Sequence, residues 1–135
     1  LAAADGDAST AEGLRDVLAA FFTYEEKRWP AVLLEFWSQA LRSDEVSRLV
    51  TQAYAAWRNQ LAAAFELAAA SGAVVVDSAQ DAAAVALAAH DGYAVQVAIT
   101  PHGSRAAMSA ADLAASIVRP LSGAKRAAEP RAMVR

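Results

Sequence analysis

The sequence has no cysteine and only two histidines, His90 and His102, among its 135 residues. The absence of cysteine excludes a disulfide framework and a thiolate metal site. Glu66, Gly72 and Asp77 interrupt the most apolar region, so no run reaches the roughly 18 uncharged apolar residues of a membrane span. No signal-peptide pattern is present. We therefore expect no membrane partner and a cytoplasmic location.

Positive charge is also scarce, since the net charge is −3 and the pI is about 5.3. This balance argues against direct nucleic-acid binding by the chain as given. The adjacent pair His90–Asp91 resembles the metal-binding pair of some phosphohydrolases, but such a site needs further histidines, and only His102 remains. No serine–histidine–carboxylate arrangement or phosphate-cradling glycine loop is legible. We expect no metal, no cofactor and no catalytic residue.

What the chain does contain is alanine, with larger apolar residues at helical spacing. Alanine favours helix and permits close approach between helices. The longest uninterrupted pattern runs from Ser43 to Gly72, with apolar residues at the i, i+3, i+4, i+7 positions of one helical face. Ser43 or Asp44 is the predicted N-cap, and Gly72 follows the predicted C-cap. This helix would be about 40 Å long, so the other helices must pack against it.

Four further helices are predicted around the long one. The first opens at a capping box of Ser9 and Glu12 and runs to about Tyr24. The second begins at Pro30 and ends near Arg42. Its connection to the long helix is so short that the two must be antiparallel or sharply angled neighbours.

Capping boxes at residues 78–81 and 109–112 open the last two helices. The first of these is predicted to be interrupted at Gly92, and the other to stop near Pro120. The valines of residues 73–76 are expected in a loop that plugs the end of the bundle.

The predicted fold class is therefore all-α, an antiparallel bundle of about five helices. We interpret residues 1–8 as the end of an earlier helix and a turn, and residues 9–121 as one helical domain. Residues 122–135 are expected to be a disordered basic tail, because they contain few large apolar groups.

Four segments carry a family resemblance. The tryptophan-rich WPAVLLEFWSQALRSDE leads into VSRLVTQAYAAWRNQLAAAFELAAASG, then DSAQDAAAVALAAHDGYAVQVAI with its Asp91–Gly92–Tyr93 step, and finally SAADLAASIVRPL. Over about residues 11–121 this order resembles the C-terminal regulatory domain of the TetR family of bacterial transcription regulators. The resemblance implies an N-terminal helix-turn-helix that binds operator DNA, which the printed sequence does not contain. Residues 1–4 would then be the end of the helix that connects the two domains.

A candidate ligand pocket is formed by aromatic and polar residues of the middle helices, because pockets are mostly apolar with a few orienting polar groups. Tyr54 and Arg58 lie one turn apart, as do His90 and Tyr93, so the four could converge if their helices face each other. The alternative is an ordinary core with Arg58 on the surface. The predicted ligand-binding residues are Leu33, Phe36, Trp37, Tyr54, Trp57, Arg58, Phe65, His90 and Tyr93.

A candidate dimer interface lies on the last two helices, which have more small and aliphatic residues than one bundle contact requires. The resemblance implies that these helices pair across a twofold axis in a homodimer, with Gly92 at a tight crossing. The alternative is packing within one protomer. The predicted interface residues are Ala84, Ala88, Val95, Ile99, Leu113, Ile117 and Val118.

The favoured function is the effector-binding and dimerisation domain of a TetR-like regulator, a repressor that senses a small apolar or aromatic ligand. The ligand would shift the protein between two arrangements by its differential affinity for them. Two alternatives stay open: a stand-alone helical module that binds a small molecule without any DNA-binding activity, and a small helical enzyme.

Overall fold

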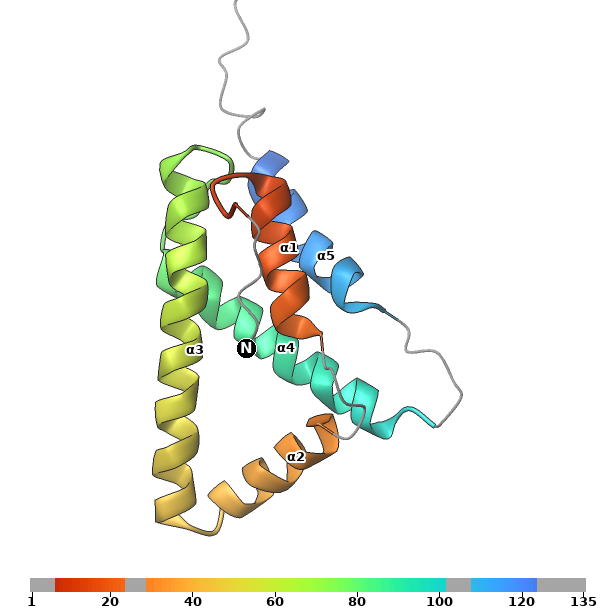
Figure 1. Ribbon diagram of the computed structural model, residues 1–135. Helices are drawn as coiled ribbons and strands as arrows, with labels where there is room; N and C mark the ends of the chain where they lie inside the picture. The colour runs from red at the N-terminus through yellow and green to blue at the C-terminus, as the bar shows by residue number, and fades with distance from the viewer. Residues whose placement is uncertain (1–6, 24–28, 102–107, 124–135) are drawn as a thin grey trace, which may run out of the picture.

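The computed structural model describes residues 7–23, 29–101 and 108–123, and these form five α-helices and no strand (Figure 1). The helices are α1 (Ala11–Phe22), α2 (Trp29–Ala40), α3 (Asp44–Ala70), α4 (Ala79–Ile99) and α5 (Ala110–Gly123). The predicted all-α class is confirmed for this part of the chain. The predictions for the connecting helix at residues 1–4, for His102 and for residues 124–135 lie outside the described residues.

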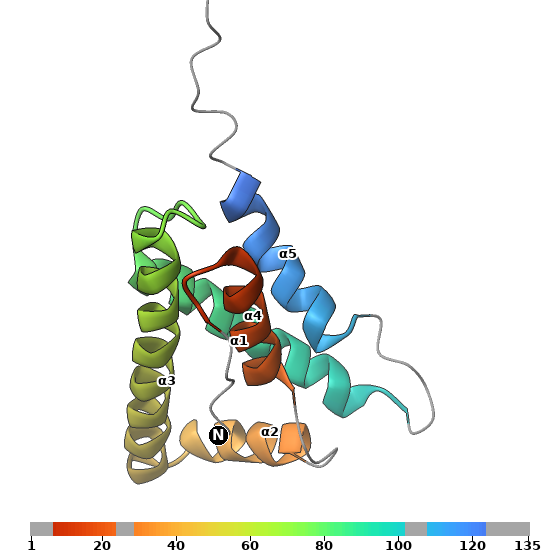
Figure 2. The ribbon, with the colours of Figure 1, turned by 45° about the horizontal axis from the view of Figure 1, so that its top comes forward.

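The 27-residue helix α3 is the spine of the structure, as its length predicted. One half of α3 packs beside α1 and α4, and α1 packs in turn against α5 (Figures 1 and 2). Helix α2 departs from a regular bundle, because it leaves the start of α3 at a sharp angle and reaches across to α4 (Figure 1). The sharply angled geometry is thus the one that the short connection at residues 41–43 adopts.

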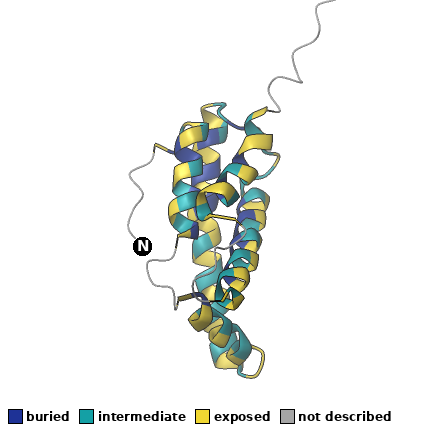
Figure 3. Cartoon of the chain, turned by 90° about the vertical axis from the view of Figure 1, so that its right-hand side faces the viewer, coloured by how far each residue is buried: buried dark blue, intermediate teal, exposed yellow. Residues whose placement is uncertain are grey.

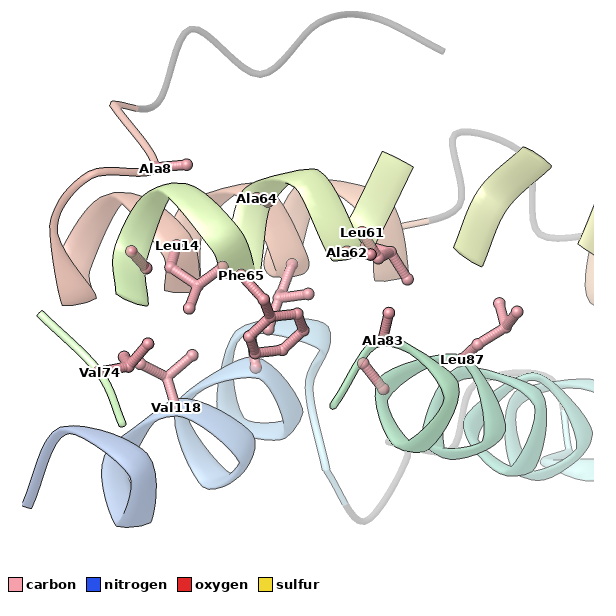
Figure 4. Packing of buried hydrophobic residues seen from close by; sticks show 14 of the residues in the cluster. Ala8, Leu14, Leu61, Ala62, Ala64, Phe65, Val74, Ala83, Leu87 and Val118 are labelled. Carbon is pink, nitrogen blue, oxygen red and sulfur yellow. The ribbon is translucent and has the colours of Figure 1, made fainter. Parts of the chain in front are cut away.

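The hydrophobic core lies around the C-terminal half of α3. Leu61, Phe65 and Ala68 of α3 are at most 2% exposed, whereas no residue of α3 before Leu61 is buried. Figure 4 shows Phe65 among residues of the neighbouring helices, including Leu14 and Val118. Figure 3 shows fewer buried residues towards the end of the molecule where α2 lies. The core therefore holds α1, α4, α5 and half of α3, and leaves the other half of α3 with α2 outside it.

The predicted caps of α3 are confirmed. The Ser43 hydroxyl accepts a hydrogen bond from the Val46 N–H at 3.4 Å. At the other end Gly72 has a φ of 73°, which glycine adopts without strain. The Gly72 N–H donates to the Ala69 carbonyl at 2.9 Å and the Ala73 N–H to the Ala68 carbonyl at 2.8 Å. This pattern is a Schellman motif, which satisfies carbonyls that the helix end would leave unpaired.

The last helix opens with the predicted capping box. The Asp112 N–H donates to the Ser109 hydroxyl at 3.1 Å, and the Ser109 N–H donates back to the Asp112 carboxylate at 3.2 Å. Ser78 caps α4 in the same way, because its hydroxyl accepts from the Asp81 N–H at 3.1 Å. Both starts are therefore encoded locally.

The N-cap of α1 is Thr10, so the prediction of Ser9 was wrong. The Thr10 hydroxyl accepts from the Gly13 N–H at 2.9 Å. Ser9 instead bonds to the Asp7 carboxylate with its side chain and also with its N–H, the latter at 3.0 Å. Both bonds lower the pKa of Asp7 because they stabilise the ionised form. The helix begins one residue later because Ser9 belongs to the turn that precedes it.

Two predicted helix breaks are also absent. Helix α4 continues through Gly92, since one exposed glycine costs a helix only about 1 kcal/mol relative to alanine. Helix α5 continues past Pro120 to Gly123, so Ser122 and Gly123 belong to the helix rather than the tail. Pro120 is tolerated because it lies in the last turn, where few backbone bonds remain to be lost.

The valine loop plugs the end of the core only in part. Val74 is 3% exposed and Val76 packs against the core, as predicted. Val75 is 48% exposed, and its backbone N–H donates to the Leu121 carbonyl at 3.1 Å. The loop therefore joins the end of α3 to the end of α5 through its backbone as well as its side chains.

Gly13 is required by a close approach of the chain before α1. A Cβ atom at this position would lie 1.9 Å from the Asp7 carbonyl oxygen, whereas at Gly92 it would meet nothing within 4 Å. We predict that Gly13→Ala destabilises the fold by about 1–3 kcal/mol, because the backbone must move. Gly123→Ala is the control, because a Cβ atom there also meets nothing within 4 Å, and it should change the free energy of unfolding by less than about 0.5 kcal/mol. Urea unfolding followed by circular dichroism measures both, and equal effects would contradict the packing of residue 7 on α1.

Candidate functional site

A cavity of about 710 Å³ lies next to the core, between α2, α3, α4 and the end of α1. Its volume is in the range of sites that hold drug-sized molecules. The first three of these helices meet as a triangle in Figure 1. The lining residues are Ala20, Phe21, Thr23, Trp29, Leu33, Phe36, Trp37, Leu49, Val50, Ala53, Tyr54, Trp57 and His90.

Helical periodicity supplies the two longest walls. On α2 the lining residues Trp29, Leu33 and Trp37 are spaced four apart, and on α3 the residues Val50, Tyr54 and Trp57 share one face. The sharp angle between the two helices separates these two faces. The side chains that would meet in a parallel pair of helices therefore line a cavity instead.

The inner wall is aromatic. The rings of Tyr54 and Trp57 lie 5.4 Å apart, and Phe21 meets Trp57 edge to face at 6.4 Å. The His90 ring lies 5.1 Å from Phe21 and 5.9 Å from Phe22. Aromatic pairs in such offset and edge arrangements are mutually attractive, so this wall is held in shape by its own contacts.

One carboxylate joins α3 to α4 behind this wall. The Tyr54 hydroxyl donates a hydrogen bond to Asp91 Oδ2 at 2.7 Å, and Asp91 Oδ1 lies 3.3 Å from His90 Nδ1. His90 is only 5% exposed, so its polar ring needs such a partner. Among the described residues no group of three histidine, cysteine, aspartate or glutamate side chains could hold a metal ion. The Tyr54–Asp91–His90 contacts therefore join α3 to α4 beside the cavity.

The structure brings six of the nine predicted ligand-binding residues to the cavity: Leu33, Phe36, Trp37, Tyr54, Trp57 and His90. Their role in binding stays a prediction. Arg58 is exposed and Tyr93 is half-buried, and neither lines the cavity, so the predicted convergence holds only for Tyr54 and His90. Phe65 is 0% exposed and belongs to the core, because it lies two turns beyond Trp57 in the half of α3 that α1 and α4 cover.

Sequence reasoning missed the contributions of α1 and of Asp91. Phe21 and Thr23 reach the cavity only because α1 ends beside it, and no pattern within α1 signals this. Leu49 also lines the cavity and is 60% exposed, although it lies on the same apolar face of α3 as the buried Leu61. Val50 and Ala53 could have been found, because they share the helical face of Tyr54 and Trp57.

The predicted interface residues divide into two groups. Ala88, Val95 and Ile99 are exposed and Ala84 is half-buried on α4. On α5 the side chains of Leu113 and Ile117 are partly buried against the core. Val118 is 3% exposed within the protomer, so its side chain cannot also cover a partner.

Helix α4 carries an exposed stripe that extends the first group. Val85, Ala88, Gly92, Val95 and Ile99 are all exposed and follow each other at spacings of three and four residues. We call these five residues the α4 stripe. With the buried residues on its other face, α4 is apolar enough to cross a membrane by length and composition alone. Core helices of soluble proteins also meet that criterion, and the packing of α4 against α3 shows that one of its faces is a core face.

A family model described as the C-terminal domain of BetI-type transcriptional repressors matches residues 10–121. The chain belongs to the TetR family. The match runs from the N-cap of α1 to the last turn of α5, so it contains the cavity and the α4 stripe. TetR-family domains of this kind generally bind small effectors, form dimers and act through DNA. Searches of curated proteins and of solved structures gave no match.

The different positions of Phe65 and Phe36 can be tested by truncation. Phe65→Ala should lower the free energy of unfolding by about 3–5 kcal/mol, because it empties a fully buried site. Phe36 is 52% exposed on the cavity wall, so Phe36→Ala should cost less than about 1 kcal/mol. Denaturant unfolding of the two variants measures the difference. A large loss for Phe36→Ala would mean that the cavity is closed around this ring.

Proposed function

We propose that the chain is the effector-binding and dimerisation domain of a TetR-family transcriptional repressor, and that it is not an enzyme. The effector is a small molecule with an apolar or aromatic body that occupies the cavity. The observation that supports this proposal is the cavity of about 710 Å³ with five aromatic residues of α2 and α3 in its wall: Trp29, Phe36, Trp37, Tyr54 and Trp57. The regulator would act in the cytoplasm, where its operator DNA is found.

The state of α2 supports ligand binding at this site. Pro30 is the one buried residue of this helix, while Trp29 and Phe36 are 53% and 52% exposed. Leu49 on the facing wall is 60% exposed. Removing apolar surface from water contributes roughly 25 cal/mol per Å², so a ligand that covers these side chains gains affinity from them. Binding would therefore favour the arrangement in which α2 lies closest to α3 and α4.

Helix α1 provides a route from the cavity to the N-terminal side of the chain. Its last turn contributes Phe21 to the cavity, and its first turn holds the residues before it. Ala8 is buried in the core, and the Ser71 hydroxyl donates to the Ser9 carbonyl. A shift of α1 on ligand binding would move residue 7, at the N-terminal end of the described residues. The effector changes DNA binding only through its differential affinity for the two arrangements.

The α4 stripe supports a homodimer. Its five residues extend along about 21 Å of helix, and their spacing of three and four is the spacing that lets two helices interlock along a seam. In the dimer that we propose, α4 packs against α4 of the partner, and Leu113 and Ile117 flank the seam. Small residues at Ala88 and Gly92 permit the helices to approach closely.

Filling the cavity from its wall tests the effector site. Ala53 lines the cavity on α3, whereas Ala56 is exposed on the same helix. We expect the uncharged dye Nile red to bind the wild type with increased fluorescence, and Ala53→Phe to weaken binding at least about tenfold because the new ring occupies the site. Ala56→Phe is the matched control and should bind as the wild type does. No binding to the wild type would overturn the effector-site proposal.

A single charge in the stripe tests the dimer. Ala88→Glu should convert a dimer at micromolar concentration into a monomer in sedimentation velocity, because two carboxylates would be buried at the seam. Gln80→Glu introduces the same charge at an exposed position of α4 outside the stripe and should leave the dimer intact. A monomeric wild type would contradict the proposed seam.

A further inference from the structure

We propose that the effector carries a flat aromatic ring system, and that the aromatic side chains of α2 select it over a saturated molecule of the same skeleton. This inference rests on the proposed effector site and names the class of ligand that the site takes. It follows from where the chain places its tryptophans and from how far each aromatic ring is covered by the protein.

All three tryptophans of the chain line the cavity. None of them is buried, since Trp29 is exposed and Trp37 and Trp57 are half-buried. In the described part of the chain, the buried residues of the hydrophobic core are alanines, leucines, valines and phenylalanines, and Trp57 only packs against them as a half-buried neighbour. The core is therefore built without a buried tryptophan, and the indole rings are concentrated where a ligand would lie.

Trp57 forms a preformed platform on the α3 side of the cavity. Its ring lies 5.4 Å from the Tyr54 ring and meets the Phe21 ring edge to face at 6.4 Å. These contacts come from α3 itself and from α1, so two helices hold the indole in place. A side chain that is already fixed loses little conformational freedom when a ligand binds, so Trp57 is suited to stacking on a flat molecule.

The rings on α2 have more of their surface accessible. Trp29 is 53% exposed and Phe36 is 52% exposed, although both line the cavity. Trp37 lines it from the same helix and is half-buried. A ligand that stacks on these rings gains from the apolar area that it removes from water and also from the ring contact itself. Helix α2 therefore provides the aromatic surface that a ligand can cover.

A saturated ligand would gain only the first of these two contributions. Aromatic rings attract each other beyond the area that they bury, because the face of each ring is negative and its edge is positive. A flexible chain would also lose rotational freedom on binding. Between Trp57 of α3 and the three rings of α2, a flat ring system can contact aromatic side chains of both walls. The cavity therefore favours an aromatic ligand.

Two probes of one skeleton test this inference: 2-naphthalenemethanol and its fully hydrogenated counterpart, decahydro-2-naphthalenemethanol. They carry the same hydroxymethyl group and differ in the aromaticity of their rings. Each is measured by its displacement of Nile red. For the wild type we expect the aromatic probe to bind about tenfold tighter than the saturated probe.

The possible results separate this inference from the proposed function. Equal affinities, tighter binding of the saturated probe, or a failure of both probes to displace bound Nile red would overturn the inference while the effector site stands. If Nile red itself does not bind the wild type, the proposed function fails and the inference fails with it.

Phe36→Leu tests the role of α2. The variant keeps an apolar side chain and removes the ring, and the fold should tolerate it because Phe36 is 52% exposed. We expect the preference for the aromatic probe to fall about threefold, while the affinity for the saturated probe stays within about twofold. Val32→Ala is the matched control, because Val32 is exposed on the same helix and does not line the cavity, and its preference should equal that of the wild type.

Two substitutions of Trp37 separate recognition of a ring from the filling of space. Trp37→Phe keeps a smaller ring and should retain most of the preference, whereas Trp37→Leu should lower it at least about threefold. Equal losses in the two variants would show that the cavity selects by volume and would overturn the inference. An unchanged preference in both Phe36→Leu and Trp37→Leu would overturn the assignment of ring recognition to α2.

Discussion

The hydrophobic core encloses only the C-terminal half of α3, and the form of the functional site depends on this constraint. Helix α3 has 27 residues, and its core neighbours α1 and α4 bury only part of its length. Burial stops at Leu61, and the half before it projects from the core. The short connection at residues 41–43 keeps α2 beside this projecting half, and α2 crosses it at a sharp angle (Figure 1). This crossing leaves a space between the two helices, and side chains from both helices line it.

Among the described residues, few polar side chains surround this space. The wall is aromatic and aliphatic, and the carboxylate of Asp91 lies behind it, bonded to Tyr54 from α3 and beside His90 on α4. This arrangement stabilises the contact between the two helices and satisfies the buried imidazole.

Helix α4 connects the two functions that we propose. One face contributes Ala83, Leu87 and Ala94 to the buried residues, while the opposite side carries the α4 stripe. His90 lines the cavity from this same helix, and Asp91 lies beside it. A ligand that moves α4 would therefore also move the proposed dimer seam, because both lie on this one helix. In a TetR-family regulator, such a movement would alter how two protomers present their N-terminal segments.

Local interactions let the sequence by itself determine the five helices, the caps at Ser43 and Gly72, and the shared face of Tyr54 and Trp57. Each depends on residues within one or two turns, which the order of amino acids specifies directly. The tertiary structure alone decided that Phe65 belongs to the core, that Val118 faces inwards and that α1 reaches the cavity. It also decided that Asp91 of α4 bonds to Tyr54 of α3. These outcomes depend on crossing angles and on which side of each helix its neighbours cover, and an apolar pattern is the same for a core, a cavity wall and a dimer seam.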